Sequence, residues 1–390
     1  MNQIKLRSHQ ATTLNRMSHH KKGQVIVPTG GGKTMCMIED LRREIKQADY
    51  RRTFVVVAPR ILLAQQLCEE FLEQITGVNV LHVHSGETHH TSTTKPEKIK
   101  TFSIYPLHLH TIIFTTYHSL HRIQEADIDV DSIYFDEAHN STAKNFFPSV
   151  EHYSAEAKRC YFFTATPKHS LTINKVGMND AYVYGKVIVN IPAPKLVKEG
   201  YILPPKMVVK TINVAEEQVN ECEHIMDTID EISVKKVLIC ARSTKQIIKL
   251  IDQTNFTQEL ASRDYSCMYI TAKTGAYIDG KKVNRDTFFD TLNTWGKDAT
   301  KRFVVLHHCI LSEGINVKGL EAAIFLRNKD IIGLSQTIGR VIRTGDNDKK
   351  YGLVVVPTWD KVGISTSKRL SGVVDTVFNR GEVAISKVRK

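Results

Sequence analysis

Two short motifs in a set order constrain this chain most strongly. The first, Pro28-Thr29-Gly30-Gly31-Gly32-Lys33-Thr34, is a glycine-rich loop that ends in Lys-Thr. The second, Asp136-Glu137-Ala138-His139, places two carboxylates directly after an apolar run. Backbone N–H groups of a glycine loop bind phosphate oxygens, and paired acids ligate magnesium and orient water. The pair of motifs therefore predicts a magnesium–nucleotide site, and an ATPase is the starting hypothesis.

The context of each motif assigns roles to single residues. A strand at Val25–Val27 precedes the loop and a helix follows it, so Lys33 is predicted to bind the β- and γ-phosphates and Thr34 the magnesium ion. Asp136 is the predicted metal ligand, and Glu137 is predicted to activate water. The general loop pattern has a glycine where this chain has Val27. A glycine turn before a chance Lys-Thr, and two acids that cap a helix, are the alternatives.

Short apolar runs alternate with helix-patterned stretches along the chain. Such runs are too apolar to face water, which predicts parallel sheets covered by helices on both faces. In the first half the expected strands are Val25–Val27, Phe54–Ala58, Thr111–Thr115, Ile133–Phe135 and Tyr161–Phe163, with helices at Lys33–Lys46 and Ile61–Glu73. In the second half they are Val237–Cys240, Met268–Thr271, Phe303–Leu306, Ala323–Leu326 and Leu353–Val356.

These patterns predict two α/β domains. The first spans residues 1–190 and the second residues 216–360, joined by a proline-rich crossing at 191–215 and followed by a basic tail at 361–390. Residues 87–107 are polar and rich in His and Thr, and we expect an exposed loop there.

The amino-acid composition limits the classes of binding partner and the cellular location that we expect. The 390 residues contain 53 Lys and Arg against 41 Asp and Glu, which gives a net charge of +12. An excess of this kind is typical of proteins with a polyanionic partner, although other basic proteins share it. The chain starts without an apolar signal segment and has no run long enough to span a membrane. A soluble intracellular protein is expected, in the cytoplasm, the nucleus or a virus-infected cell.

Cysteines and histidines favour no metal site. The seven cysteines are scattered, never form CxxC, and mostly fall in apolar runs, which indicates a reducing compartment and small core residues. The histidine pairs lack zinc-finger spacing and HExxH is absent. We therefore expect solvated loop histidines at His82, His84, His89 and His90, and strand histidines at His307 and His308.

The order of further motifs resembles superfamily 2 helicases along nearly the whole chain. Leu6-Arg7-Ser8-His9-Gln10 resembles the opening motif in which Arg7 and Gln10 would recognise adenine. Ala58-Pro59-Arg60 and Thr115-Thr116-Tyr117 resemble nucleic-acid-contacting motifs, which implicates Pro59, Arg60 and Thr116. Thr164-Ala165-Thr166-Pro167 resembles the motif that couples hydrolysis to movement, together with His139.

The resemblance continues in the second half. Ile239–Lys245 and the strand ending at Thr271 imply nucleic-acid contacts by Arg242 and Thr271. Leu311–Leu320 is similar to the fifth motif, with Gly314 as an implied nucleotide contact and Asn316 where the family commonly has aspartate. The run Gln336 to Arg343 matches QxxGRxxR, so Gln336, Arg340 and Arg343 are implied catalytic residues, the arginines stabilising transition-state charge.

The resemblance implies two tandem RecA-like domains that bind ATP and Mg²⁺ between them and a nucleic acid across their tops. The LRxxQ opening, DEAH and Leu196–Pro204 look most like the branch of type III restriction subunits, XPB-type repair helicases, and phage and poxvirus helicases. That branch implies duplex or branched DNA rather than RNA. The motifs leave no room in this chain for a nuclease domain, and we expect a monomer, with protein partners as a possible source of specificity. A clamp or sensor that never separates strands, an RNA helicase, and an ATPase that remodels protein are the competing interpretations.

Overall fold

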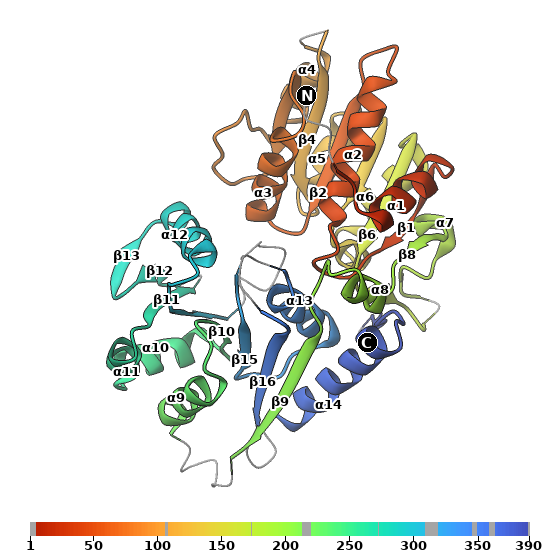
Figure 1. The fold of residues 1–390 in the computed structure, drawn as a ribbon. Coiled ribbons are helices and arrows are strands. Elements are labelled where there is room, and N and C mark those ends of the chain that lie inside the picture. The colour runs from red at the N-terminus through yellow and green to blue at the C-terminus, as the bar shows by residue number, and fades with distance from the viewer. Residues whose placement is uncertain are drawn as a thin grey trace. The chain divides into compact units, whose positions relative to one another are not determined.

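The computed structural model describes residues 5–105, 108–172, 174–212, 220–271, 273–308, 319–344, 349–358 and 363–388 (Figure 1). The chain divides into two compact units. Unit 1 comprises Met1–Pro192 and Val383–Lys390, and unit 2 comprises Ala193–Glu382. Each unit is built on a mostly parallel sheet with helices on both faces, so the predicted fold class is confirmed.

The described residues of unit 1 form a seven-stranded sheet whose neighbouring strands are all parallel, in the order β3-β4-β2-β5-β6-β1-β8. Its strands are β1 (Lys22–Ile26), β2 (Thr53–Ala58), β3 (Val78–Val83), β4 (His110–Thr116), β5 (Ser132–Phe135), β6 (Arg159–Thr164) and β8 (Val187–Asn190). Its helices are α1 (Ser8–Ser18), α2 (Lys33–Lys46), α3 (Ile61–Leu72), α4 (Pro96–Ile104), α5 (Leu120–Glu125), the 3-10 helix η1 (Ala138–Thr142), α6 (Phe147–Glu156) and α7 (Ala181–Tyr184).

Strand β2 shows why this sheet is apolar on both sides. Val55 and Val57 pack in one core cluster with side chains of α4, α5 and α6. Phe54 and Val56 point to the opposite face and are equally buried, and α3 packs against β2 and β4. Because successive side chains of a strand alternate between the faces, a strand covered twice reads as a continuous apolar run. Polar residues that bind ligands are therefore expected at the carboxyl ends of the parallel strands.

The described residues of unit 2 form an eight-stranded sheet in the order β13-β12-β11-β14-β10-β15-β16-β9. Its strands are β9 (Pro205–Thr211), β10 (Lys236–Cys240), β11 (Ser266–Thr271), β12 (Gly275–Ile278), β13 (Lys281–Val283), β14 (Phe303–His307), β15 (Ala322–Phe325) and β16 (Gly352–Thr358). Strand β12 pairs antiparallel with both β11 and β13, and the other neighbouring strands pair parallel. Its helices are α8 (Ala193–Lys198), α9 (Glu221–Ile232), α10 (Thr244–Asp252), α11 (Phe256–Ser262), α12 (Arg285–Lys297), α13 (Ile331–Val341), α14 (Ile364–Val373) and the π-helical η3 (Val374–Asn379).

Two stretches that the sequence left as connections contain regular structure. Within the expected crossing at 191–215, α8 forms and β9 joins the edge of the second sheet beside β16. After Asp360, α14 packs against α13, and the short strand β17 (Ser386–Lys387) pairs with β7 (Lys168–His169) inside unit 1. The predicted domain boundaries stay predictions. The expected crossing and the expected tail both contribute helices and strands to the two units.

Two expectations about residues 82–107 are wrong. The segment expected as an exposed loop contains α4, which begins with Pro96 at its first turn and buries Ile99 and Ser103, spaced i, i+4, on one face. This buried stripe is short, one of its two residues is polar, and its flanks are polar, so periodicity did not reveal it. The expectation of solvated loop histidines also fails for His82 on β3 and for His84, since both side chains are buried.

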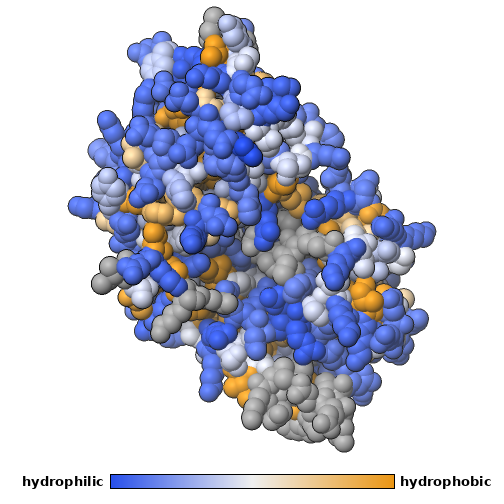
Figure 2. Space-filling view, turned by 180° about the vertical axis from the view of Figure 1, so that it is seen from behind, coloured by the Kyte–Doolittle hydropathy of each residue, from blue (hydrophilic) through white to orange (hydrophobic). Residues whose placement is uncertain are grey.

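The surface carries no long apolar face on the side drawn in Figure 2, where hydrophilic side chains predominate and apolar ones form small, scattered groups. None of the helices in the described part of the chain combines the length and the apolar composition that a bilayer crossing requires.

Candidate functional site

The phosphate-loop motif forms the predicted turn between a strand and a helix. Strand β1 ends at Ile26, and α2 begins at Lys33 directly after the loop. Gly30 and Gly32 have φ angles of 85° and 84°, a left-handed conformation that glycine adopts without steric cost. The Gly31 amide donates a hydrogen bond to the Pro28 carbonyl, at 2.9 Å. The loop therefore has the backbone that an anion-binding helix start requires.

The first turn of α1 lies against this loop. The Gln10 side chain accepts a hydrogen bond from the Arg7 amide at 2.9 Å and donates one to the Gly32 carbonyl at 3.3 Å. The buried His9 ring is 2.7 Å from the Gly31 carbonyl through its Nε2 atom. Sequence reasoning assigned Arg7 and Gln10 to adenine and missed His9, whose only signal was its place inside the same opening motif.

The carboxylates of the second motif follow β5 and reach the loop. The Asp136 amide donates to the Val57 carbonyl at 2.9 Å, which extends the pairing of β5 with β2. Glu137 lies in the left-handed region with φ 46°, an uncommon conformation for a residue with a side chain. Its Oε1 atom is 3.3 Å from Nζ of Lys33, and both side chains are largely buried. The two predicted motifs thus meet in space.

His139 connects Glu137 to the threonine motif after β6. Its Nδ1 atom lies 3.1 Å from Oγ1 of Thr164 and 3.5 Å from Oε2 of Glu137. The Thr164 hydroxyl oxygen accepts a further bond from the Thr166 amide at 3.1 Å. A polar chain therefore runs from Lys33 through Glu137 and His139 to Thr164, across the ends of β1, β5 and β6.

The charges at this site fit a nucleotide with a divalent cation. Burial, and next the charge of Glu137, raise the pKa of Asp136 to about 7, while Lys33 lowers it. A cation beside a buried carboxylate reverses such a shift. The buried Thr29 hydroxyl in the phosphate loop has no hydrogen-bond partner in the described part of the chain. A bound oxyanion would satisfy it, so the donor set fits ATP with Mg²⁺.

The predicted nucleic-acid residues of unit 1 lie at adjacent strand ends. Ala58, which precedes Pro59 and Arg60, is paired with Thr116 at the ends of β2 and β4. The Arg60 side chain is exposed, and Arg60 is the N-cap of α3. A connection that sequence reasoning missed follows immediately: the buried Tyr117 hydroxyl donates to the Asp136 carbonyl at 2.9 Å.

Unit 2 places its predicted nucleic-acid residues in the same way. Arg242 follows β10 and is exposed, and Thr271 ends β11, where its hydroxyl lies 2.7 Å from that of Thr274. Strands β10 and β11 both pair with β14 in parallel, so the two residues lie at the same edge of the sheet. The backbone amide of Arg242 donates to the side chain of Gln246, which leaves the guanidinium outside that bond.

Helix α13 carries the QxxGRxxR motif. Gln336 and Arg340, spaced i, i+4, are buried on α13, and Arg343 follows the helix, bridged to Ile202. Positive charge gathers beside them: burial, then Lys329 and Arg340, hold the pKa of His307 well below its usual range. Gly314 and Asn316 lie outside the described residues. Lys33 belongs to unit 1 and Arg340 and Arg343 to unit 2, so their action on one nucleotide stays a prediction.

The two sheets and the phosphate loop are those of the RecA-like fold class. Comparisons with known proteins indicate which families within that class the chain resembles. Residues 3–169 match the family model of the Type III restriction enzyme, res subunit, a superfamily 2 helicase family. The resemblance stated from the motifs is thereby confirmed over residues 3–169. A search among curated proteins gives no match.

Three solved structures share the fold. They are the ATP-dependent Type ISP restriction-modification enzyme LlaBIII bound to DNA (18% identity, TM-score 0.75, 99% of this chain and 31% of that chain), a nuclease-deletion mutant of the Type ISP enzyme LlaGI in complex with a DNA substrate mimic (18%, 0.70, 98% and 30%), and a fragment of a putative HsdR subunit of a type I restriction enzyme from Vibrio vulnificus (14%, 0.64, 98% and 68%). The chain spans less than a third of the length of the two Type ISP enzymes.

Proposed function

We propose that the chain is an ATP-dependent motor that moves on duplex or branched DNA. The observation that carries the proposal is the polar chain Lys33–Glu137–His139–Thr164, which joins a phosphate loop, a candidate base and a coupling motif within one unit. DNA is favoured over RNA because two proteins of similar fold are described as bound to DNA or to a DNA mimic. The net charge of +12 supports a polyanionic partner.

In the proposed cycle the loop and Lys33 bind the phosphates, while Thr34 and Asp136 hold the magnesium ion. Lys33 is paired with Glu137 at 3.3 Å, and phosphate binding to Lys33 competes with that pair. The released Glu137 orients and deprotonates the attacking water. When bound, ATP with Mg²⁺ supplies the phosphoryl group and neutralises part of its charge.

Unit 2 completes the proposed site. Arg340 and Arg343 stabilise the charge that spreads over the transferred phosphoryl group, and Gln336 contacts the same region. Arg7 and Gln10 select adenine, and Gly314 contacts the nucleotide. His139 with Thr164 and Thr166 transmits hydrolysis to the strand ends, where Pro59, Arg60, Thr116, Arg242 and Thr271 hold the backbone of the nucleic acid.

Steady-state ATPase with no nucleic acid, single-stranded, duplex and forked DNA, and RNA, at one salt concentration, tests the proposal. We expect strong stimulation by duplex or forked DNA, and a decrease of that stimulated activity by about 10²-fold or more in Lys33→Ala or Glu137→Gln. Stimulation by RNA alone would mean that the substrate is RNA rather than DNA. Absence of stimulation by any nucleic acid would contradict the proposal of a nucleic-acid motor.

A strand-displacement assay and a triplex-displacement assay separate a motor from a clamp. The first reports unwinding and the second reports movement along duplex DNA, both with ATP present. Triplex displacement that requires ATP hydrolysis is the expected result. DNA binding and ATPase without either displacement would instead identify an ATP-gated clamp.

A further inference from the structure

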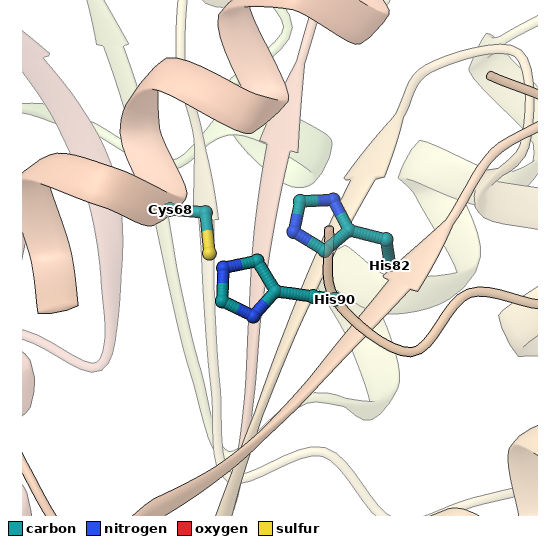
Figure 3. A group of neighbouring side chains, drawn as sticks. All are labelled: Cys68, His82 and His90. Atoms are coloured by element: carbon teal, nitrogen blue, oxygen red, sulfur yellow. The ribbon is translucent and has the colours of Figure 1, made fainter. Parts of the chain in front are cut away.

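A cysteine and two histidines from three separate segments converge on one face of unit 1 (Figure 3). Cys68 lies on α3, His82 on β3, and His90 in the segment that follows β3. One potential ligand atom from each residue lies within 4.8 Å of the other two. Cys68 and His82 are buried, and His90 is the most accessible of the three. These residues are separate from the phosphate loop and the DEAH motif.

The segment that carries His90 is held in place by several contacts. The His82 amide donates to the Thr91 carbonyl at 2.8 Å, and the Thr93 amide donates to the His82 carbonyl at 3.0 Å. The Gln65 side chain, on α3, donates to the Glu87 carbonyl. The backbone therefore returns onto β3 beyond His90 and is tied to α3 before it, which positions the histidine next to the cysteine.

His82 has the surroundings of a metal ligand. Its buried Nε2 atom has no hydrogen-bond partner within the described residues, whereas Nδ1 lies 3.0 Å from Nε2 of His84. Metal-binding histidines use one ring nitrogen for the metal and fix the ring through a hydrogen bond of the other. Burial, and next the charges of His84 and His90, lower the pKa of His82 to about 4, so the ring is neutral at neutral pH.

We propose that Cys68, His82 and His90 bind a zinc ion, with a water molecule in the fourth position. One thiolate and two imidazoles are a ligand set that suits Zn²⁺ and does not suit Mg²⁺. Tetrahedral zinc with bond lengths of about 2.0–2.3 Å places its ligand atoms roughly 3.3–3.7 Å apart. The cluster is within about 1.5 Å of that spacing, a difference that rotation of the more accessible His90 side chain can supply.

The protons balance as follows. Binding displaces the thiol proton of Cys68 to solvent, since the thiolate is the ligand. His82 moves its proton to Nδ1, which then donates to Nε2 of His84, so both rings change tautomer when the metal binds. His84 then carries its own proton on Nδ1 and gives up the 3.2 Å bond that this atom accepts from the Gly86 amide. One weak local hydrogen bond is exchanged for three metal bonds.

The zinc ion would join α3 to the segment after β3. Helix α3 begins after Arg60, a predicted nucleic-acid contact, so a metal at Cys68 would fix the far part of the same helix. The proposed role is to cross-link these two segments, and it does not depend on ATP hydrolysis or on the choice of DNA over RNA.

Metal binding to the full chain tests the site directly. After removal of metal with a chelator, the chain is titrated with Zn²⁺ by calorimetry and with Co²⁺ by absorption spectroscopy. We expect one tight Zn²⁺ site and a thiolate-to-cobalt charge-transfer band that Zn²⁺ abolishes. His90→Ala should weaken Zn²⁺ binding about 100-fold or more, because even outer-shell changes cost 10- to 100-fold.

The neighbouring histidine provides the matched control. His89 is exposed and outside the cluster, so His89→Ala should bind Zn²⁺ as the original chain does. Cys68→Ser should lose the charge-transfer band, and circular dichroism shows whether it stays folded. Absence of the cobalt band in the unaltered chain, or equal Zn²⁺ affinity of His89→Ala and His90→Ala, would overturn the site.

Discussion

The predicted site residues of unit 1 and those of unit 2 differ in charge and in how they are held. In unit 1, Asp136 and Glu137 are buried beside Lys33, and the groups form a continuous polar chain across three strand ends. In unit 2, cationic side chains gather near the end of β14, where burial, and then Lys329, Arg340 and Arg327, lower the pKa of His307. One unit presents carboxylates at its strand ends and the other presents cations.

This difference indicates complementary roles. Phosphoryl transfer needs a metal held by carboxylates and also positive groups that stabilise charge in the transition state. In our proposal, unit 1 supplies the first set together with the phosphate loop, and unit 2 supplies the second. Variants in the two units should therefore fail in different ways: unit 1 variants in metal use and water activation, unit 2 variants in the chemical step alone.

The largest effect is expected in unit 2. Arg340→Ala should lower kcat of the nucleic-acid-stimulated ATPase about 10³- to 10⁵-fold, the range for an arginine finger, while ATP affinity changes little. Rapid-quench kinetics and a fluorescent ATP analogue measure the two quantities. Arg285→Ala on the exposed face of α12 is the control.

Because Arg340 is buried, a loss of activity must be separated from a loss of folding. Arg340→Lys keeps the charge but not the planar donor fork, and should remain strongly impaired. A folded Arg340→Ala variant with unchanged kcat would remove the arginine from the proposed chemistry.

In unit 1, Glu137→Gln should lower kcat about 10²- to 10⁴-fold, the contribution typical of a general base. The amide keeps the size of the side chain but accepts no proton. Glu151→Gln, at an exposed position of α6, should leave the rate unchanged. Equal rates for the two variants in a phosphate-release assay would exclude Glu137 as the base.

The ion pairs of the two units offer a comparison in stability. Arg159 makes two 2.9 Å hydrogen bonds to buried Asp40, which also accepts one from Tyr134. Arg159→Met should cost about 3–5 kcal/mol, because it leaves a buried charge unpaired. Arg263 is paired with Asp230 and Glu259 on the surface of unit 2. Arg263→Met should lower stability by at most about 1 kcal/mol.

Hydrogen exchange measured by mass spectrometry reads the two units separately. We expect Arg159→Met to reduce the protection of amides in the strands of unit 1. Arg263→Met should change the protection of unit 2 only a little. Similar losses in both variants would mean that the buried ion pair contributes no more to stability than the surface pair does.

The smallest expected effect concerns Tyr117. Tyr117→Phe removes one hydrogen bond to the Asp136 carbonyl, a loss of about 0.5–1.5 kcal/mol. We expect a two- to tenfold lower ATPase, roughly that energy expressed as a rate. Tyr153→Phe, a buried tyrosine of the same core cluster, is the control, and an equal decrease in both would point to general destabilisation.

Much of the fold was predictable because its strands are covered twice. The run Phe54–Ala58 could hardly face water, and α2 has the bounds expected from its pattern, Lys33–Lys46. Elements with weaker patterns escaped. Helix α4 buries only Ile99 and Ser103 among polar residues, and the antiparallel β12 and β13 are short and half-exposed.

The site was predictable where residues are contiguous in a motif and not where contacts join distant segments. The meeting of Lys33 with Glu137 followed from the two motifs. The contacts of His9 with Gly31 and of Tyr117 with Asp136 depend on which strands are neighbours, and no spacing encodes that order. The burial of His82 likewise follows from β3, a strand that the sequence did not reveal.

The most direct test of the central claim is a double-mutant cycle between the units. Single-turnover ATP hydrolysis with duplex DNA is measured for the original chain, Lys33→Ala, Arg340→Ala and the double variant. Residues that act together on one nucleotide lose grossly non-additive amounts of activity. We predict a double variant about as slow as the slower single variant. Rate losses that simply multiply would contradict a nucleotide site shared by Lys33 and Arg340.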